Sequence, residues 1–307
     1  MKKIIIGARG SKLSSAYVAR VKSLILKNNI DIKEEQLSFK IIKTSGDIFH
    51  DKKLSEIGGK NLFCKEIEEK LIRNKIDIAV HSLKDMGPEN NSSIIIGAYI
   101  KRNDPRDAFI SLNKKNIGDL KKHDIICSSS RRRMLQTKLI NQEVLFKDIR
   151  GNIDTRLKKV EEKKINAIIL AVAGIQSLNL EKKITKIFTL DEMIPAAGQG
   201  IIAVQCRKKD LGIRKILSKI NDTETNECAT AERHMLKEIG GDCHTAVGAI
   251  AILKNNKIKL KAQLFSDDGR KHYVYEITGE RKDAKDVGVR VGKQLLKLAG
   301  SGFKKKL

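Results

Sequence analysis

The feature that most constrains the fold is the alternation of short apolar segments with amphipathic ones at the start of the chain. The apolar segments have the length and β-branched content of strands, and between them apolar residues recur at helical spacing. In chain order we predict a strand over Lys3–Ala8, a helix that opens at Ser11, a strand over Gln36–Thr44, a helix over about 61–74 and a strand over Ile76–His81. This β-α-β-α-β order is typical of a largely parallel sheet, which binds ligands at the carboxyl ends of its strands.

A second α/β unit follows a polar segment at Ile100–Pro105, so we expect a hinge or domain boundary near Asn103. Its predicted elements are strands Ala108–Ser111 and Ile125–Ser128, helix Arg131–Ile140, a helix over about 155–163 and strand Ala167–Val172. A further strand, Gly200–Gln205, comes after Pro195.

The chain changes character again at Thr223. There we predict helix Thr223–Ile239, strands Ala246–Leu253, Lys257–Phe265 and Lys271–Thr278, and helix Ala284–Leu298. Asn255-Asn256 and Asp267-Asp268-Gly269 are typical hairpin turns between these strands. This last part is therefore a small α+β domain.

The charge of the chain, +25 from 62 basic and 37 acidic residues, raises the question of nucleic-acid binding. Most of the excess is lysine, 46 residues against 16 arginines, and aromatic residues make up only 4%. Since the lysines are spread over nearly every predicted exposed face, a solvated surface explains them better than a nucleic-acid site. We expect no nucleic-acid partner and a monomer.

Apolar stretches such as Ala167–Gly174 are far shorter than the roughly 20 residues that span a bilayer. The apolar start breaks at Gly7 and Arg9, too early for a secretory signal, so we expect a cytoplasmic protein with no membrane partner. The five cysteines form no C-x-x-C pair, which excludes the usual zinc and iron–sulfur signatures, and we predict no metal.

Arginines accompany glycine and serine where predicted strands end. Arg9-Gly10-Ser11, Ser128-Ser129-Ser130-Arg131-Arg132-Arg133, and Arg150-Gly151-Asn152 with Arg156 repeat this arrangement. Backbone N–H groups, hydroxyls and guanidiniums there suit carboxylates or phosphates, although an ordinary serine cap with a solvated arginine also explains a single instance. We assign Arg131 and Arg132 to anion binding and Arg133 to the exposed surface.

Two further residues, Asp85 and Cys243, are candidates for a chemical role because of where they lie in the predicted elements. Asp85 closely follows the strand Ile76–His81, where it is either a salt-bridge partner or a carboxylate facing developing positive charge. Cys243 lies in the glycine loop Gly240-Gly241-Asp242-Cys243-His244, whereas the other four cysteines lie in predicted helices or strands. Because adjacent positions of an extended chain point to opposite sides, a Cys243–His244 dyad is not expected.

Taken together, these residues resemble the porphobilinogen deaminase (hydroxymethylbilane synthase) family almost end to end. The matching segments are Arg9–Leu13, Thr44–Asp47, Gly58–Phe63, His81–Asp85, Ser128–Arg132, Arg150–Asn152, Pro195–Gly200 and Gly241–Cys243. The resemblance implies a transferase of haem and porphyrin biosynthesis. Such an enzyme polymerises four molecules of porphobilinogen into 1-hydroxymethylbilane, with release of ammonia.

The resemblance also implies the fold and the cofactor. The fold is expected to be α/β, with two periplasmic-binding-protein-like domains and a small C-terminal α+β domain. The domains are 1–99 with a returning segment 200–217, then 103–195, then 220–307. A dipyrromethane, one per chain, is expected as a covalent primer on Cys243 through a thioether.

The resemblance assigns a role to each matching residue. Asp85 is the catalytic residue, and Lys60 and Phe63 belong to a lid loop. Besides Cys243, the cofactor-binding residues are Ser11, Lys84, Ser128, Ser129, Arg131, Arg132, Arg150 and Gly151. The substrate-binding residues are Arg9, Arg150, Arg156 and Gln199.

The chain departs from the family pattern at Asn61 and Ser130, and at Ser177, where many relatives have an arginine. Lys182 or Lys183 is a candidate replacement for that arginine. Two alternatives remain: a non-catalytic small-anion-binding protein on the same scaffold, which would need neither Asp85 nor Cys243, and a nucleic-acid-associated protein, which rests on charge alone.

Overall fold

The computed structural model describes residues 3–48, 63–89, 91–113, 115–162, 165–241, 245–266 and 268–300. The chain divides into two compact units, residues 1–103 with 201–226, and residues 104–200 with 227–307. It therefore passes three times from one unit to the other, and each unit is described by itself. Among the described helices none has the length and apolar character to cross a membrane.

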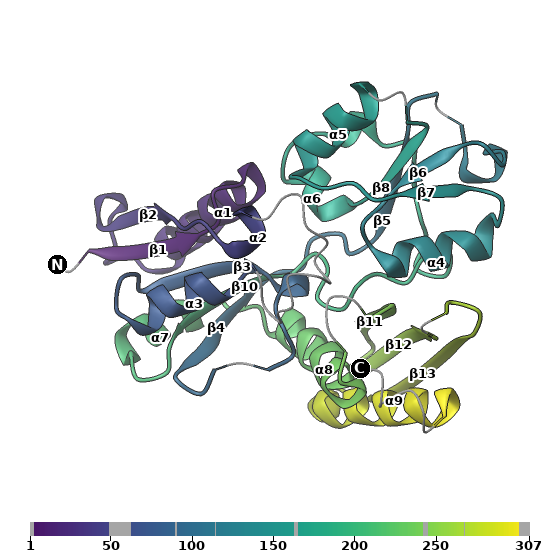
Figure 1. The fold of residues 1–307 in the computed structure, drawn as a ribbon. Coiled ribbons are helices and arrows are strands. Elements are labelled where there is room, and N and C mark those ends of the chain that lie inside the picture. Colours follow the sequence, from purple (N-terminus) through teal and green to yellow (C-terminus); the bar gives the residue numbers. More distant parts are fainter. Residues whose placement is uncertain are drawn as a thin grey trace. The chain divides into compact units, whose positions relative to one another are not determined.

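Unit 1 is built on a five-stranded sheet in the order β2-β1-β3-β10-β4 (Figure 1). Its strands are β1 (Ile4–Ala8), β2 (Leu37–Ile41), β3 (Ile78–Ser82), β4 (Ile94–Ile100) and β10 (Ile202–Arg207). The first three run parallel, and β10 is antiparallel to both of its neighbours. A strand from late in the sequence thus lies inside the first sheet.

Helices cover both faces of this sheet. Its helices are α1 (Lys12–Asn28), α2 (Ser45–Ile48), α3 (Lys65–Ile72) and α7 (Leu211–Ser218). Alternate residues of β1 point to opposite faces of the sheet. Ile4 and Ile6 pack with α1 and α7, and Ile5 packs with the cluster that includes α3. Both faces being buried explains why these strands are continuous apolar runs.

Unit 2 contains a second five-stranded sheet of the same kind, in the order β7-β6-β8-β5-β9. Its strands are β5 (Asp107–Ser111), β6 (Ile125–Cys127), β7 (Leu145–Lys147), β8 (Ala167–Ala171) and β9 (Lys186–Ile187). The helices that accompany them are α4 (Arg131–Ile140), α5 (Ile153–Glu162) and α6 (Val172–Gln176). The predicted α/β organisation is therefore confirmed for both sheets.

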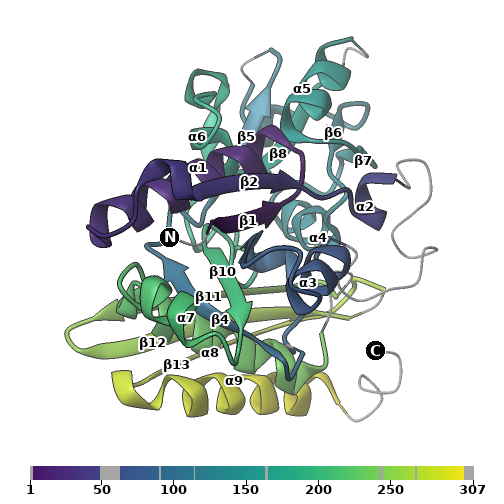
Figure 2. The ribbon, with the colours of Figure 1, turned by 90° about the vertical axis from the view of Figure 1, so that its left-hand side faces the viewer.

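Unit 2 also contains the α+β part of the chain. An antiparallel sheet of β11 (Val247–Lys254), β12 (Lys257–Phe265) and β13 (His272–Glu280) packs on α8 (Thr223–Ile239) and α9 (Ala284–Ala299) (Figure 2). Both residues of the Asn255-Asn256 turn have positive φ, 51° and 57°, as a tight hairpin requires. The fold class predicted from the sequence is confirmed, whereas the three exact domain ranges stay a prediction.

One buried carboxylate ties the α+β part to the segment that leads into β10. Glu232 of α8 accepts hydrogen bonds from the backbone N–H of Gly198 at 2.6 Å and of Ala251 at 2.8 Å. Gly198 and Gly200 have φ of +75° and +84°, which few residues other than glycine adopt. The glycines of the Gly198-Gln199-Gly200 motif therefore have a backbone role here.

Candidate active site

In unit 1 the carboxyl end of β1 leads directly into the N-terminus of α1. Ser11 caps the helix, because its hydroxyl accepts a hydrogen bond from the N–H of Ser14 at 3.1 Å. The predicted strand-to-helix junction is therefore present, with Arg9 beside it.

Arg9 is engaged by a neighbouring segment. Its Nε and Nη2 donate to Oδ1 of Asp47 at 3.1 and 2.5 Å, and its guanidinium lies 4.2 Å from the centre of the Phe63 ring. Burial favours a higher pKa for Asp47, but hydrogen bonds from Arg9 and Thr44 outweigh it and hold that pKa below its usual value. A substrate carboxylate at Arg9 would have to compete with Asp47, a residue whose role the sequence did not suggest.

Asp85 lies in a short 3₁₀ turn, Leu83–Asp85, that continues from β3. Leu83 is buried, whereas Lys84 and Asp85 are half-buried. The thiol of Cys64, just before α3, donates to the backbone carbonyl of Asp85 over 3.6 Å and so helps to fix the turn. The fold thus presents a half-buried carboxylate at the carboxyl end of a central strand, as expected.

His81 lies behind this turn on β3 and is almost fully buried, with 6% of its surface exposed. Burial lowers the pKa of His81 to about 4, although an interaction with the Gln205 side chain opposes this shift. Its Nε2 has no hydrogen-bond partner within the described part of the chain. His81 is therefore a neutral imidazole at pH 7.

In unit 2 the segment after β6 forms the predicted serine-rich helix start. Ser130 caps α4, and the hydroxyl of Ser128 accepts from the N–H of Ser130 at 3.2 Å. Ser128 is buried, whereas Ser129 and Arg131 are exposed and open to a ligand. These two exposed groups fit the predicted anion-binding role.

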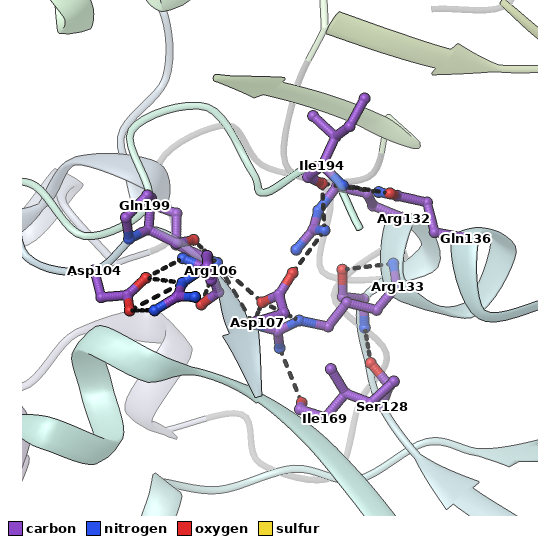
Figure 3. A network of polar contacts seen from close by, with 12 residues as sticks. Asp104, Arg106, Asp107, Ser128, Arg132, Arg133, Gln136, Ile169, Ile194 and Gln199 are labelled. Carbon is purple, nitrogen blue, oxygen red and sulfur yellow. Dashed lines mark hydrogen bonds and ion pairs between the residues drawn. The ribbon is translucent and has the colours of Figure 1, made fainter. Parts of the chain in front are cut away.

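The next two arginines face inward (Figure 3). Nη1 of Arg132 lies 2.8 Å from Oδ2 of Asp107, and Nη2 of Arg133 lies 2.7 Å from Oδ1 of the same carboxylate. The prediction that Arg133 is an exposed surface charge is wrong. It fails because the buried face of α4 is polar and is matched by a carboxylate on β5.

Asp107 is completely buried, and burial by itself would raise its pKa. The two guanidiniums outweigh that effect and hold the pKa of Asp107 well below its usual value. Gln199 completes the cluster, since its amide nitrogen donates to Pro105 O at 2.7 Å and to Asp107 Oδ1 at 2.9 Å. The side chain of Gln199 is thus engaged inside unit 2, and its contact with substrate stays a prediction.

The third arginine motif forms a tight turn. Gly151 has φ of +114°, and Nε of Arg156 donates to its carbonyl oxygen at 2.7 Å. Arg150 is half-buried, with Nε 3.6 Å from the exposed carboxylate of Asp148. Its guanidinium is therefore only loosely held, which suits a residue that binds an anion.

At Ser177, where the chain departs from the family pattern, the side chain is bound to its own helix. Ser177 ends α6, and its hydroxyl donates to Ala173 O at 2.7 Å. Of the two candidate replacements, Lys183 pairs with Glu161 at 2.8 Å, and Lys182 is exposed. Cys243, Lys60 and Asn61 lie outside the described residues, so their predicted roles stay predictions.

Two family models match consecutive parts of the chain. Residues 4–215 match the porphobilinogen deaminase dipyrromethane cofactor-binding domain, and residues 226–297 match the porphobilinogen deaminase C-terminal domain.

Curated relatives agree over nearly the full length. The porphobilinogen deaminase of Alkaliphilus metalliredigens is 38% identical over 298 residues, covering 96% of this chain and 93% of the relative. That of Francisella tularensis subsp. novicida is 40% identical over 280 residues, covering 91% and 92%. Among solved structures, the substrate-binding protein of an amino acid ABC transporter aligns over 77% of this chain and 94% of its own, with 14% identity and a TM-score of 0.36.

Proposed function

Because the chain belongs to the porphobilinogen deaminase family and is a transferase, we propose that it joins four molecules of porphobilinogen into 1-hydroxymethylbilane. Ammonia leaves at each addition, and the growing chain is primed by a dipyrromethane held on Cys243 as a thioether. Water then cleaves the tetrapyrrole from the primer and supplies the hydroxyl group of the product. The family's cofactor-binding domain spans residues 4–215, which confirms dipyrromethane as the cofactor.

The observation that carries the proposal is the excess of guanidinium groups in unit 2. Arg132 and Arg133 share a single buried carboxylate, Arg131 is exposed, and Arg150 is loosely held. Nε of Arg132 is buried without a hydrogen-bond partner in the described part of the chain, so the donors of this side chain are not all used. These residues fit a ligand rich in carboxylates, such as a dipyrromethane with acetate and propionate arms.

When bound, dipyrromethane supplies the nucleophilic pyrrole carbon. The residues of the chain must do the rest. Arg131, Arg132 and Arg150 would bind carboxylate arms, with the hydroxyl of Ser129 as a further donor. In unit 1, Arg9 would bind a substrate carboxylate once it leaves Asp47.

Asp85 would provide the negative charge that the reaction needs. Loss of ammonia from the aminomethyl arm of porphobilinogen leaves a cationic carbon conjugated with the pyrrole nitrogen. A carboxylate that accepts a hydrogen bond from that pyrrole N–H stabilises the cation as it forms. The same carboxylate can then receive the proton released when the new carbon–carbon bond restores aromaticity.

Intact-protein mass spectrometry tests this function. The purified chain should exceed its sequence mass by two linked pyrrole units, and Cys243→Ala should remove the increment. Cys206→Ala is the matched control, because burial raises the pKa of Cys206 to about 11 and leaves little thiolate to react. Brief exposure to porphobilinogen should then add single-pyrrole steps.

A chain at its bare sequence mass would contradict the covalent primer, and an adduct on one of the buried thiols would contradict its attachment to Cys243. A chain that binds porphobilinogen without converting it would instead favour the non-catalytic anion-binding alternative.

A further inference from the structure

The cluster around Asp107 is buried and contains more positive than negative charge. Asp107 is fully buried, and the side chains of Arg132 and Arg133 are only 4% and 8% exposed. With two guanidiniums and one carboxylate, the cluster has a surplus of one positive charge. Such a surplus attracts an anion much more strongly inside a protein than at its surface.

The two arginines use Asp107 unequally (Figure 3). Arg133 donates from Nε at 3.0 Å and from Nη2 at 2.7 Å, both to Oδ1, and its Nη1 donates to Ile169 O at 3.1 Å. Every nitrogen of this guanidinium therefore has a partner inside unit 2.

Arg132 is less well satisfied. Its Nη1 donates to Ile194 O at 2.7 Å and forms the ion pair with Oδ2 of Asp107 at 2.8 Å. Nε of Arg132 is buried and has no hydrogen-bond partner within the described residues. An arginine usually binds a carboxylate with two nitrogens, one to each oxygen. Here Arg133 occupies Oδ1, one of the two oxygens that Arg132 would need for this arrangement.

We propose that Arg133 is a positioning residue: because it shares the one carboxylate of Asp107 with Arg132, the buried cluster keeps one positive charge in excess, and this excess attracts a carboxylate of the bound pyrrole ligand toward Arg132. This inference rests on the proposed function, and it gives a role to an arginine outside the segments that carry the family resemblance. Arg133 would not touch the ligand, because all of its nitrogens are already engaged.

Charge-changing variants separate this role from simple packing. Arg133→Gln removes the surplus charge, whereas Arg133→Lys keeps it without the planar fork. The double variant Asp107→Asn/Arg133→Gln removes one charge of each sign and so restores the surplus. Lys138→Gln, at an exposed position of the same helix, is the control for the loss of one positive charge.

The measurement is the rate at which cofactor-free chain gains the two-pyrrole mass from added porphobilinogen, read by intact-protein mass spectrometry. Arg133→Gln should load at least about 10-fold more slowly than wild type, the effect expected for one unit charge at short range in a protein interior. Arg133→Lys and the double variant should load close to the wild-type rate, although both should unfold at a lower temperature. Lys138→Gln should behave as wild type.

The outcomes are distinct. Arg133→Gln loading as fast as wild type would overturn the inference and leave the proposed function intact. A double variant as slow as Arg133→Gln would also overturn it, because packing rather than charge would then matter. If Arg133→Gln does not fold, fast loading of Arg133→Lys supports the inference and slow loading overturns it. A wild-type chain that never gains pyrrole mass would refute the proposed function, and the inference with it.

Discussion

Replacing His81 by glutamine should flatten the pH dependence of the stability of unit 1. In the folded chain burial lowers the pKa of His81 to about 4, whereas an unfolded histidine has a pKa of about 6.5. Between these values the unfolded state binds a proton that the folded state does not. The stability contributed by neutral His81 is therefore fully present above pH 6.5 and is lost as the pH falls toward 4.

The size of the effect follows from the two pKa values. Each pH unit inside this window costs about 1.4 kcal/mol, so between pH 7 and pH 5 His81 alone should lower the free energy of unfolding by about 2 kcal/mol. Glutamine does not titrate, and the variant should lack this component even if it is less stable at pH 7.

Urea unfolding at pH 7, 6 and 5 measures the effect. Circular dichroism monitors the unfolding, because the chain contains no tryptophan whose fluorescence could report it. His123→Gln is the control, because His123 is exposed. Wild type and His123→Gln should lose stability in parallel, while His81→Gln should lose about 2 kcal/mol less between pH 7 and pH 5. Equal losses for all three proteins would refute the view that His81 is buried in its neutral form.

Three further predictions concern the site and the core. Asp85→Asn should keep its fold and its cofactor but lose turnover on the order of 10²-fold in a porphobilinogen assay, because it keeps the shape and removes the charge; turnover within a few-fold of wild type would exclude this role. Gly288→Ala should destabilise the chain by about 1–3 kcal/mol or more in thermal unfolding, because an added Cβ would lie 2.3 Å from Ala231 O, whereas at Gly118 it would meet nothing within 4 Å and alanine there should be nearly neutral. Ser177→Arg should tighten porphobilinogen binding in a calorimetric titration if the missing guanidinium is uncompensated, and unchanged affinity would favour compensation by a lysine.

Elements whose ends are marked by clear signals could be predicted from the sequence. The bounds of α4, α8 and β12 were predicted as the structure has them, because caps, turns or a change of period mark their ends. β4 and α7 were not predicted. Gly97 interrupts the apolar run of β4, and it is there because Leu217 of α7 packs where a side chain would lie, with an added Cβ 2.7 Å from Leu217 Cδ1. That contact joins residues far apart in the sequence, and no local pattern shows it.

The candidate site shows the same limit. Nothing in the sequence distinguishes the three consecutive arginines Arg131, Arg132 and Arg133. Only the helix geometry decides that the first is exposed and the next two are buried. The missed signal was Asp107, a carboxylate at the start of the apolar segment Ala108–Ile110. A charge inside a buried strand requires a counter-charge, and that argument could have led to the arginines of α4.

The position of β10 between β3 and β4 affects how the protein is made. A ribosome that has just finished β4 must add about 100 more residues before β10 emerges, which at usual synthesis rates takes roughly 5 to 20 s. During that time β3 and β4 have no partner on the sides where β10 will pair, and unpaired edges of apolar strands favour association with other chains. All strands of the second sheet, by contrast, have been synthesised before β10 appears. The nascent chain can therefore complete its second sheet while the first is still open, and a chaperone that acts on this protein during translation should bind the exposed edges of β3 and β4.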